Sequence, residues 1–163
     1  VTCISPSKAF NIAGLQIANI VAADDGMRER IDRAININEV CDVNPFGVEA
    51  TIAAYNEGEE WLTQLIGYLK GNYEFMKDYC AKHLPDFPTA KLEGTYLVWM
   101  DCSVLHIPSE ELERQLVEQA RLWLNAGAMY RSPKEGFMRW NIACPRQRLA
   151  EALDRFRSFV AER

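Results

Sequence analysis

The sequence predicts an α/β fold, and three observations support this prediction. Two aromatic and apolar runs, residues 95–101 and 137–143, have the composition of strands in a sheet. Other segments repeat apolar residues at helical spacing, and residues 59–84 form the longest of them. Hydrophobic residues make up 48% of the 163 positions, so a core can form. We therefore expect one ordinary domain, or one domain with part of another.

Composition and charge argue against several classes of protein. The net charge is −5 with both signs interspersed, so no basic stripe for nucleic acid is present. No run of 18 apolar residues could span a membrane, and no signal peptide is visible. The five cysteines are odd in number and widely spaced, and the two histidines do not cluster, so we expect no metal site. Reduced thiols favour a cytoplasmic protein.

The first 22 residues predict two short strands around a turn that holds a lysine. Residues 1–5 and 15–22 are apolar runs, and Lys8 follows the first of them. The second run is almost continuously apolar, which predicts a strand buried on both faces. Loops at strand ends often carry chemistry. Because two strands do not make a stable sheet, we expect the edge of a larger sheet here.

Three helices are predicted next. Asp24 and Asp25 begin the first, since acidic residues suit the positive end of the helix dipole. The second begins with Pro45 at its first position and stops at Gly58. The third, residues 59–84, ends where two prolines follow it.

The second half of the chain predicts strands and helices in alternation. A short strand at 89–92 precedes the strand at 95–101. A helix capped by Ser109 is expected to bury Leu124 and to stop at Gly127. Residues 128–136 predict a strand and turn, and Pro145 opens the last helix.

The strand at 137–143 carries an arginine on an otherwise apolar face. Its alternation places Phe137, Arg139, Asn141 and Ala143 on one side. An arginine held among apolar side chains needs an anionic partner. That partner is either an acidic residue of the same domain or the carboxylate of a ligand.

Two motifs resemble one known family. The segment Ser-x-Ser-Lys-x-Phe-Asn-Ile-x-Gly-Leu, residues 5–15, resembles the cofactor-lysine segment of fold-type I pyridoxal phosphate enzymes, the class I/II aminotransferase superfamily. It is most similar to the branch of cystathionine β-lyases and other C–S lyases. Gly-Phe-x-Arg-x-Asn-x-Ala-Cys-Pro-Arg, residues 136–146, resembles the strand of that superfamily that binds the substrate carboxylate.

The resemblance implies a role for each matched residue. Lys8 would form the Schiff base with pyridoxal 5'-phosphate and move the substrate's α-proton. Ser5, or alternatively Ser7, would place a hydroxyl near the cofactor phosphate. Arg139 would bind the α-carboxylate of an amino-acid substrate, because its planar fork matches two oxygens, and Asn141 would assist.

The sequence departs from the family at two places. Many members carry an arginine for the phosphate where this chain has Gln16. Many lyase-branch members have Phe-Gly before Gly136, whereas this chain reads Met-Tyr-Arg at 129–131. The first difference favours the lyase branch, and the second leaves the substrate open.

The resemblance also implies a domain plan. Residues 1–57 would be a remnant of the large cofactor-binding domain, and residues 58–163 would be the C-terminal small domain, a short and mainly antiparallel sheet covered by helices. Most of the cofactor site would precede Val1, so we expect the fragment alone to be inactive. The parent would be a homodimer.

The expected reaction is β-elimination by a C–S lyase, which converts a cysteine-conjugate amino acid to pyruvate, ammonia and a thiol. An aminotransferase is the first alternative, because it would use the same lysine and arginine. A non-catalytic interaction module is the second.

Overall fold

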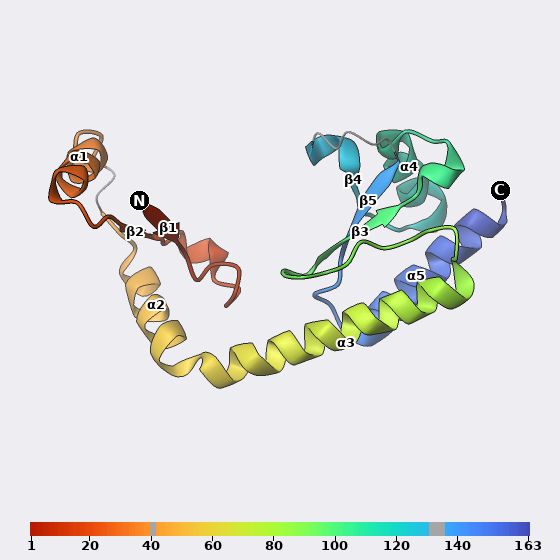
Figure 1. Cartoon of the computed structure of the whole chain (residues 1–163), viewed down its shortest axis with the longest axis horizontal. Coiled ribbons are helices and arrows are strands. Elements are labelled where there is room, and N and C mark those ends of the chain that lie inside the picture. The colour runs from red at the N-terminus through yellow and green to blue at the C-terminus, as the bar shows by residue number, and fades with distance from the viewer. Residues whose placement is uncertain (40–41, 131–135) are drawn as a thin grey trace. The chain divides into compact units, whose positions relative to one another are not determined.

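The computed structural model describes residues 1–39, 42–130 and 136–163. Contacts divide the chain into two compact units, Val1–Ile66 and Gly67–Arg163. The border falls inside the longest helix, α3 (Glu59–His83), so both units contain part of it (Figure 1).

The first unit begins with a two-stranded antiparallel sheet. Strand β1 (Thr2–Ile4) pairs with β2 (Asn19–Val21), with Thr2 opposite Val21. The expected pair of strands is confirmed, but the second strand is shorter than the predicted 15–22, and Leu15 belongs to a 3-10 helix (Ala13–Leu15) instead. All three residues of β2 are exposed, so the prediction of a strand buried on both faces is wrong for the described chain. Within the described residues β2 pairs only with β1.

Side-chain caps set the start of the first two helices in this unit. Asp24 precedes α1 (Asp25–Asn36) and accepts a hydrogen bond of 2.7 Å from the amide of Met27. Asn44 accepts one of 3.0 Å from the amide of Phe46, at the start of α2 (Pro45–Glu57). Pro45 takes the first helical position, as predicted.

The second unit is built on a three-stranded antiparallel sheet in the order β3 (Leu97–Asp101), β5 (Phe137–Asn141), β4 (Asn125–Ala126). Leu97 lies opposite Asn141, and Asn125 lies opposite Arg139. The short sheet covered by helices is the expected α/β architecture. The expected strand at 89–92 is reduced to one bridge between Thr89 and Met100.

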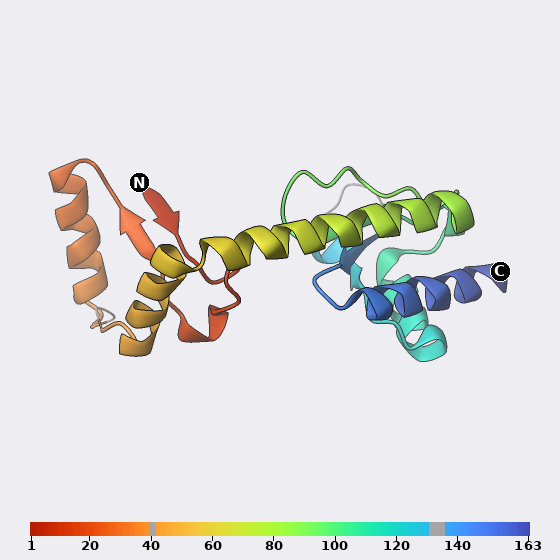
Figure 2. The same ribbon diagram turned by 90° about the horizontal axis from the view of Figure 1, so that it is seen from below.

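Two helices lie side by side against one face of this sheet, the second part of α3 and α5 (Arg146–Ala161) (Figures 1 and 2). Alternate strand residues point to this face and are buried, as the alternation of β5 predicts. The ring of Phe156 on α5 meets Trp140 edge to face at 5.7 Å. The largest fully buried side chains include Met76, Val98, Met100, Met138, Trp140, Leu149, Leu153 and Phe156.

Helix α3 runs unbroken through Gly67 and Gly71, which confirms the predicted long helix. Gly71 has a packing reason, because a Cβ there would lie 3.1 Å from Nη2 of Arg146. The buried residues of α3 in the second unit are spaced four apart and so share one face of the helix: Asn72, Met76 and Cys80.

The predicted helix to Leu124 is wrong only at its end, over residues 121–124. Helix α4 (Ser109–Gln115) passes into a π-helical turn (Leu116–Ala120) and ends at Arg121, which has a left-handed φ of 52°. The chain then extends, so that Asn125 and Ala126 can pair with β5 as β4. Gly127 therefore does not cap a helix.

Ser109 is not the cap of α4 either. Pro108 holds that position, and the Ser109 hydroxyl accepts a hydrogen bond of 3.1 Å from the amide of Ala128. Gly127–Tyr130 form a 3-10 turn, where a strand was predicted. The rest of that predicted strand and turn, including Arg131, lies outside the described residues. None of the described helices is long and apolar enough to cross a membrane.

Candidate active site

The lysine loop follows β1 directly and is tightly turned. The amide of Phe10 donates to the carbonyl of Pro6 at 3.0 Å, and the amide of Ile12 donates to the carbonyl of Ser7 at 3.1 Å. Pro6 is buried under this turn, whereas the side chain of Lys8 is exposed. Within the described chain no carboxylate forms an ion pair with Lys8. Its amine is therefore exposed and has no ion-pair partner in that part of the chain.

The two predicted serines contact each other beside Lys8. The Ser5 hydroxyl donates to the carbonyl of Ile17 at 2.7 Å, and it accepts from the amide of Ser7 at 3.2 Å. The hydroxyls of Ser5 and Ser7 are also hydrogen-bonded. Since a hydroxyl has one proton, the Ser5 proton is used by Ile17 and the Ser7 proton points to Ser5. By rotating one bond, the Ser7 hydroxyl can donate its hydrogen bond to a ligand instead. The Ser5 hydroxyl would have to break its hydrogen bond to the carbonyl of Ile17 to do the same.

The ring of Phe10 anchors the loop to the helices of the first unit. It stacks on Trp61 at 5.9 Å between ring centres and meets Tyr55 edge to face at 6.3 Å. Gly58 leaves room for it, because a Cβ there would lie 2.5 Å from Cε1 of Phe10. Sequence reasoning interpreted Gly58 only as a helix break and missed this contact.

A second glycine seats the end of the same loop. A Cβ on Gly47 would lie 3.2 Å from the carbonyl oxygen of Leu15 and 3.3 Å from Cβ of Ile17. Gly47 is buried on α2. Helix α2 and the start of α3 therefore form the platform that fixes the residues around Lys8.

In the second unit, Arg139 lies on the central strand and is held by uncharged neighbours. Its Nη2 donates to Oδ1 of Asn125 at 2.9 Å. Its guanidinium carbon lies 4.3 Å from the centre of the Tyr130 ring, close enough for a cation–π contact. Tyr130 in turn meets Trp99 edge to face at 5.5 Å.

Arg139 has no acidic partner among the described residues. Its Nε is buried and has no hydrogen-bond acceptor within that part of the chain. The ion pair within the domain, one of the two alternatives from the sequence, is therefore not formed there. A buried charged donor without an acceptor is unfavourable, so the arginine retains capacity for an anion.

Asn141 does not reach Arg139 with its amide. Its Oδ1 accepts a hydrogen bond of 2.9 Å from the amide of Ala143, and the side chain is exposed. It shares the face of Arg139, as the alternation predicts, but pairs across the sheet with Leu97. Its amide oxygen serves the turn after β5.

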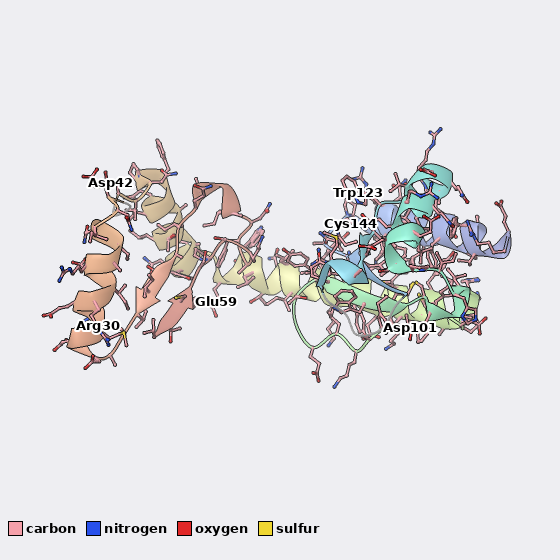
Figure 3. All side chains as sticks on the ribbon, turned by 90° about the horizontal axis from the view of Figure 1, so that it is seen from above. Arg30, Asp42, Glu59, Asp101, Trp123 and Cys144 are labelled. Carbon is pink, nitrogen blue, oxygen red and sulfur yellow. The ribbon has the colours of Figure 1, made fainter. Side chains whose placement is uncertain are left out.

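A buried amide fixes the junction between β5 and α5. Asn72 donates to the carbonyls of Ile142 and Cys144 at 2.8 and 2.9 Å, and its Oδ1 accepts from Nε of Arg146 at 2.7 Å. Cys144 marks this junction in Figure 3. Sequence reasoning missed Asn72, although a polar residue within the apolar stripe of α3 was a usable signal.

The buried thiols are poor nucleophiles. Burial raises the pKa of Cys80 to about 11, and burial also raises the pKa of Cys102 above its ordinary range. Both are therefore protonated at neutral pH and behave as small apolar side chains.

Comparison with known proteins shows the family of this chain. Residues 1–156 match the model of the family described as aminotransferase class I and II. The chain belongs to this family. It is 34% identical over 161 residues to the cystathionine β-lyase PatB of Bacillus subtilis (strain 168), an alignment that covers 99% of this chain and 42% of the relative.

Solved structures agree with this placement. A pyridoxal phosphate-bound putative aminotransferase from Clostridium difficile 630 is 40% identical, with a TM-score of 0.91, over 95% of this chain and 40% of that one. A pyridoxal phosphate-bound C–S lyase from Staphylococcus hominis is 31% identical, with a TM-score of 0.86, over 98% and 42%. The chain spans about two fifths of the length of these relatives.

Proposed function

We propose that this chain is part of a pyridoxal 5'-phosphate-dependent C–S lyase. The observation that best supports the proposal is the match over 161 residues to a cystathionine β-lyase. The substrate would be an amino acid whose β-carbon carries sulfur. Together with water, the reaction yields pyruvate, ammonia and a thiol.

The residues around Lys8 fit the cofactor in their chemistry. An aldehyde needs an accessible amine, and Lys8 has an exposed one without an ion-pair partner among the described residues. A phosphate needs neutral or positive donors, and two serine hydroxyls lie on the same loop. Of these, Ser7 is the readier donor, because Ser5 is bonded to Ile17.

Lys8 would have two tasks. Its amine would hold the cofactor covalently through the aldehyde. When the substrate's amino group replaces it, the freed amine would take the proton from Cα. Pyridoxal 5'-phosphate, when bound, supplies an aromatic ring that accepts the electrons left at that carbon.

Arg139 would bind the substrate α-carboxylate. Its Nε has no acceptor among the described residues, so this donor is left for one carboxylate oxygen. Because Asn125 and Tyr130 carry no charge, they leave the positive charge of Arg139 for the ligand. Asn141 shares that face, and we propose that it assists through the turn that it stabilises.

The lyase proposal has a direct test. Purified full-length protein is incubated with L-cystathionine, and pyruvate is measured without any added keto acid. Pyruvate formation is expected, and Lys8→Ala should abolish it together with the absorbance band of the lysine-bound cofactor. Turnover that requires a keto acid would contradict lyase activity, and an unchanged band in Lys8→Ala would contradict the role of the lysine.

An aminotransferase is the second candidate. Over the matched part of each chain, the putative aminotransferase from Clostridium difficile 630 is 40% identical to this chain, whereas the C–S lyase of Staphylococcus hominis is 31% identical. Lys8 and Arg139 would keep the same roles. Transfer of the amino group to a keto acid, without pyruvate from cystathionine, would favour this candidate.

We also propose the wider organisation of the protein. Residues 1–57 would belong to the large cofactor-binding domain and residues 58–163 to the small domain, in a homodimer located in the cytoplasm. The fragment alone would be inactive. Free thiols at Cys3, Cys80, Cys102 and Cys144 support a reducing compartment. Light scattering of the full-length protein would measure the dimer.

A further inference from the structure

Arg139 is fixed from two sides by residues on other elements of the second unit. Asn125 lies directly across the sheet on β4, and its Oδ1 accepts from Nη2 of Arg139 at 2.9 Å. Tyr130 covers one face of the guanidinium at 4.3 Å. Trp99, which pairs with Arg139 from β3, supports the Tyr130 ring at 5.5 Å.

The three neighbours Asn125, Tyr130 and Trp99 are all uncharged. A carboxylate in the place of Asn125 would bind the guanidinium more strongly and would neutralise it. An amide oxygen and a ring face restrict its orientation and preserve its positive charge. The Nε is left buried without an acceptor in the described chain.

Tyr130 contributes little to the core. It is 42% exposed and lies on a 3-10 turn at the surface. Its two ring contacts, with Arg139 and Trp99, are therefore its main interactions in the described structure. A residue of this kind can be replaced without loss of the fold.

We propose that Asn125 and Tyr130 are positioning residues for the carboxylate-binding arginine. Asn125 fixes one end of the guanidinium, and Tyr130 fixes its plane. They act through Arg139 and contact no reacting atom. The inference rests on the proposed function, in which Arg139 binds a carboxylate.

The test measures carboxylate binding at Arg139 itself. The Nε–H signal of Arg139 is observed by nitrogen-15 NMR in the full-length protein and assigned by its loss in Arg139→Lys. Sodium acetate is titrated against sodium chloride at equal ionic strength. We expect a saturable shift with acetate and none with chloride.

The variants separate positioning from fold. Tyr130→Leu should weaken acetate binding about fivefold, whereas Tyr130→Phe keeps the ring and should stay within about twofold. Asn125→Asp keeps the shape of the side chain but supplies a competing carboxylate, so it should weaken binding more than about tenfold. Met129→Ala is the matched control, because Met129 is 62% exposed and adjoins Tyr130.

Each contrary outcome has a distinct meaning. If the wild-type signal does not respond to acetate, Arg139 does not bind carboxylates, and both the proposed role of Arg139 and this inference are overturned. If the wild type responds and Tyr130→Leu and Asn125→Asp bind acetate equally well, with unchanged melting temperatures, only the positioning role is overturned.

Discussion

At the scale of single residues, neighbouring side chains fix the position of the candidate lysine. Lys8 is exposed, and its place is fixed by Phe10, two residues later, which stacks on Trp61. Gly58 makes that contact possible because it has no side chain. The Phe10 ring therefore anchors the loop, and the missing side chain at Gly58 leaves the room that this ring needs.

The substitution Gly58→Ala tests this dependence. A Cβ at that position would lie 2.4 Å from the carbonyl of Ala54 and 2.5 Å from the Phe10 ring, so something must shift. We expect a loss of about 1–3 kcal/mol in the free energy of unfolding of the cooperative unit that contains it. Urea titration followed by the fluorescence of Trp61 measures it.

Gly67→Ala is the control for Gly58→Ala. It lies in the same helix as Trp61, and a Cβ there meets nothing within 4 Å. Alanine should stabilise the helix by about 0.5–1 kcal/mol, because glycine is the poorer helix former. Equal effects of the two alanines would show that Gly58 has no packing role.

At the scale of elements, the second unit is joined by polar bonds at the places where its helices meet its sheet. Asn72 is the main example, since one fully buried side chain satisfies two carbonyls and one arginine. It links α3 to the junction between β5 and α5. The direction of the chain after Arg139 is set by this junction.

Replacing Asn72 with leucine should therefore cost more than a typical surface change. Two carbonyls and Nε of Arg146 would lose their partner, and we expect a loss of about 2–4 kcal/mol, since each unsatisfied buried group costs about 1–3. Denaturant titration of the chain measures it. Lys70→Ala, at an exposed position two residues away on α3, should change the free energy of unfolding by less than about 0.5 kcal/mol. A loss below 1 kcal/mol in Asn72→Leu would contradict the structural role of the amide.

Element boundaries show where sequence reasoning succeeds and where it fails. The start of α2 was predictable, because Pro45 after Asn44 has a local cause. The end of the helical stretch that begins with α4 was not predictable, because two patterns overlap there. Leu122, Leu124 and Ala126 are buried at the spacing of a strand. Leu116, Ala120 and Leu124 also have the spacing of a helix. Pairing with β5 decides between the two patterns, and pairing across the chain is not visible in a local window.

The same limit applies to the candidate site. Lys8 and Arg139 could be predicted as candidate site residues because each lies within a motif of contiguous residues. Asn125 and Tyr130 were missed, because they reach Arg139 only after the sheet has formed. Short motifs therefore reveal the candidate reactive groups, whereas the residues around them are brought together by contacts between segments that are distant in the sequence.

At the scale of the whole molecule, the two units differ in how much they bury. The second unit contains nearly all of the buried hydrophobic side chains, including Met100, Met138 and Trp140. In the first unit, helix α1 has no buried residue and both strands are exposed. Burial is the main stabilising contribution to folding, so the two units should differ in stability.

Hydrogen exchange should reveal this difference. In the 163-residue chain, we expect the amides of β3 and β5 to exchange at least about a hundredfold more slowly than those of α1, since exchange follows local opening. Mass spectrometry of peptic fragments measures both in one experiment. Equal protection of α1 and β5 would show that the chain unfolds as a single unit.

Each unit contains a tryptophan whose intrinsic fluorescence can report on it without a chemical label. Trp61, which stacks on Phe10, reports on the lysine loop, and Trp140, which is fully buried beside Phe156, reports on the sheet. Trp123, at 78% exposure, is already surrounded by solvent and should change its emission little on unfolding (Figure 3). Replacing one tryptophan at a time with phenylalanine would thus assign each spectral change to one region of the molecule.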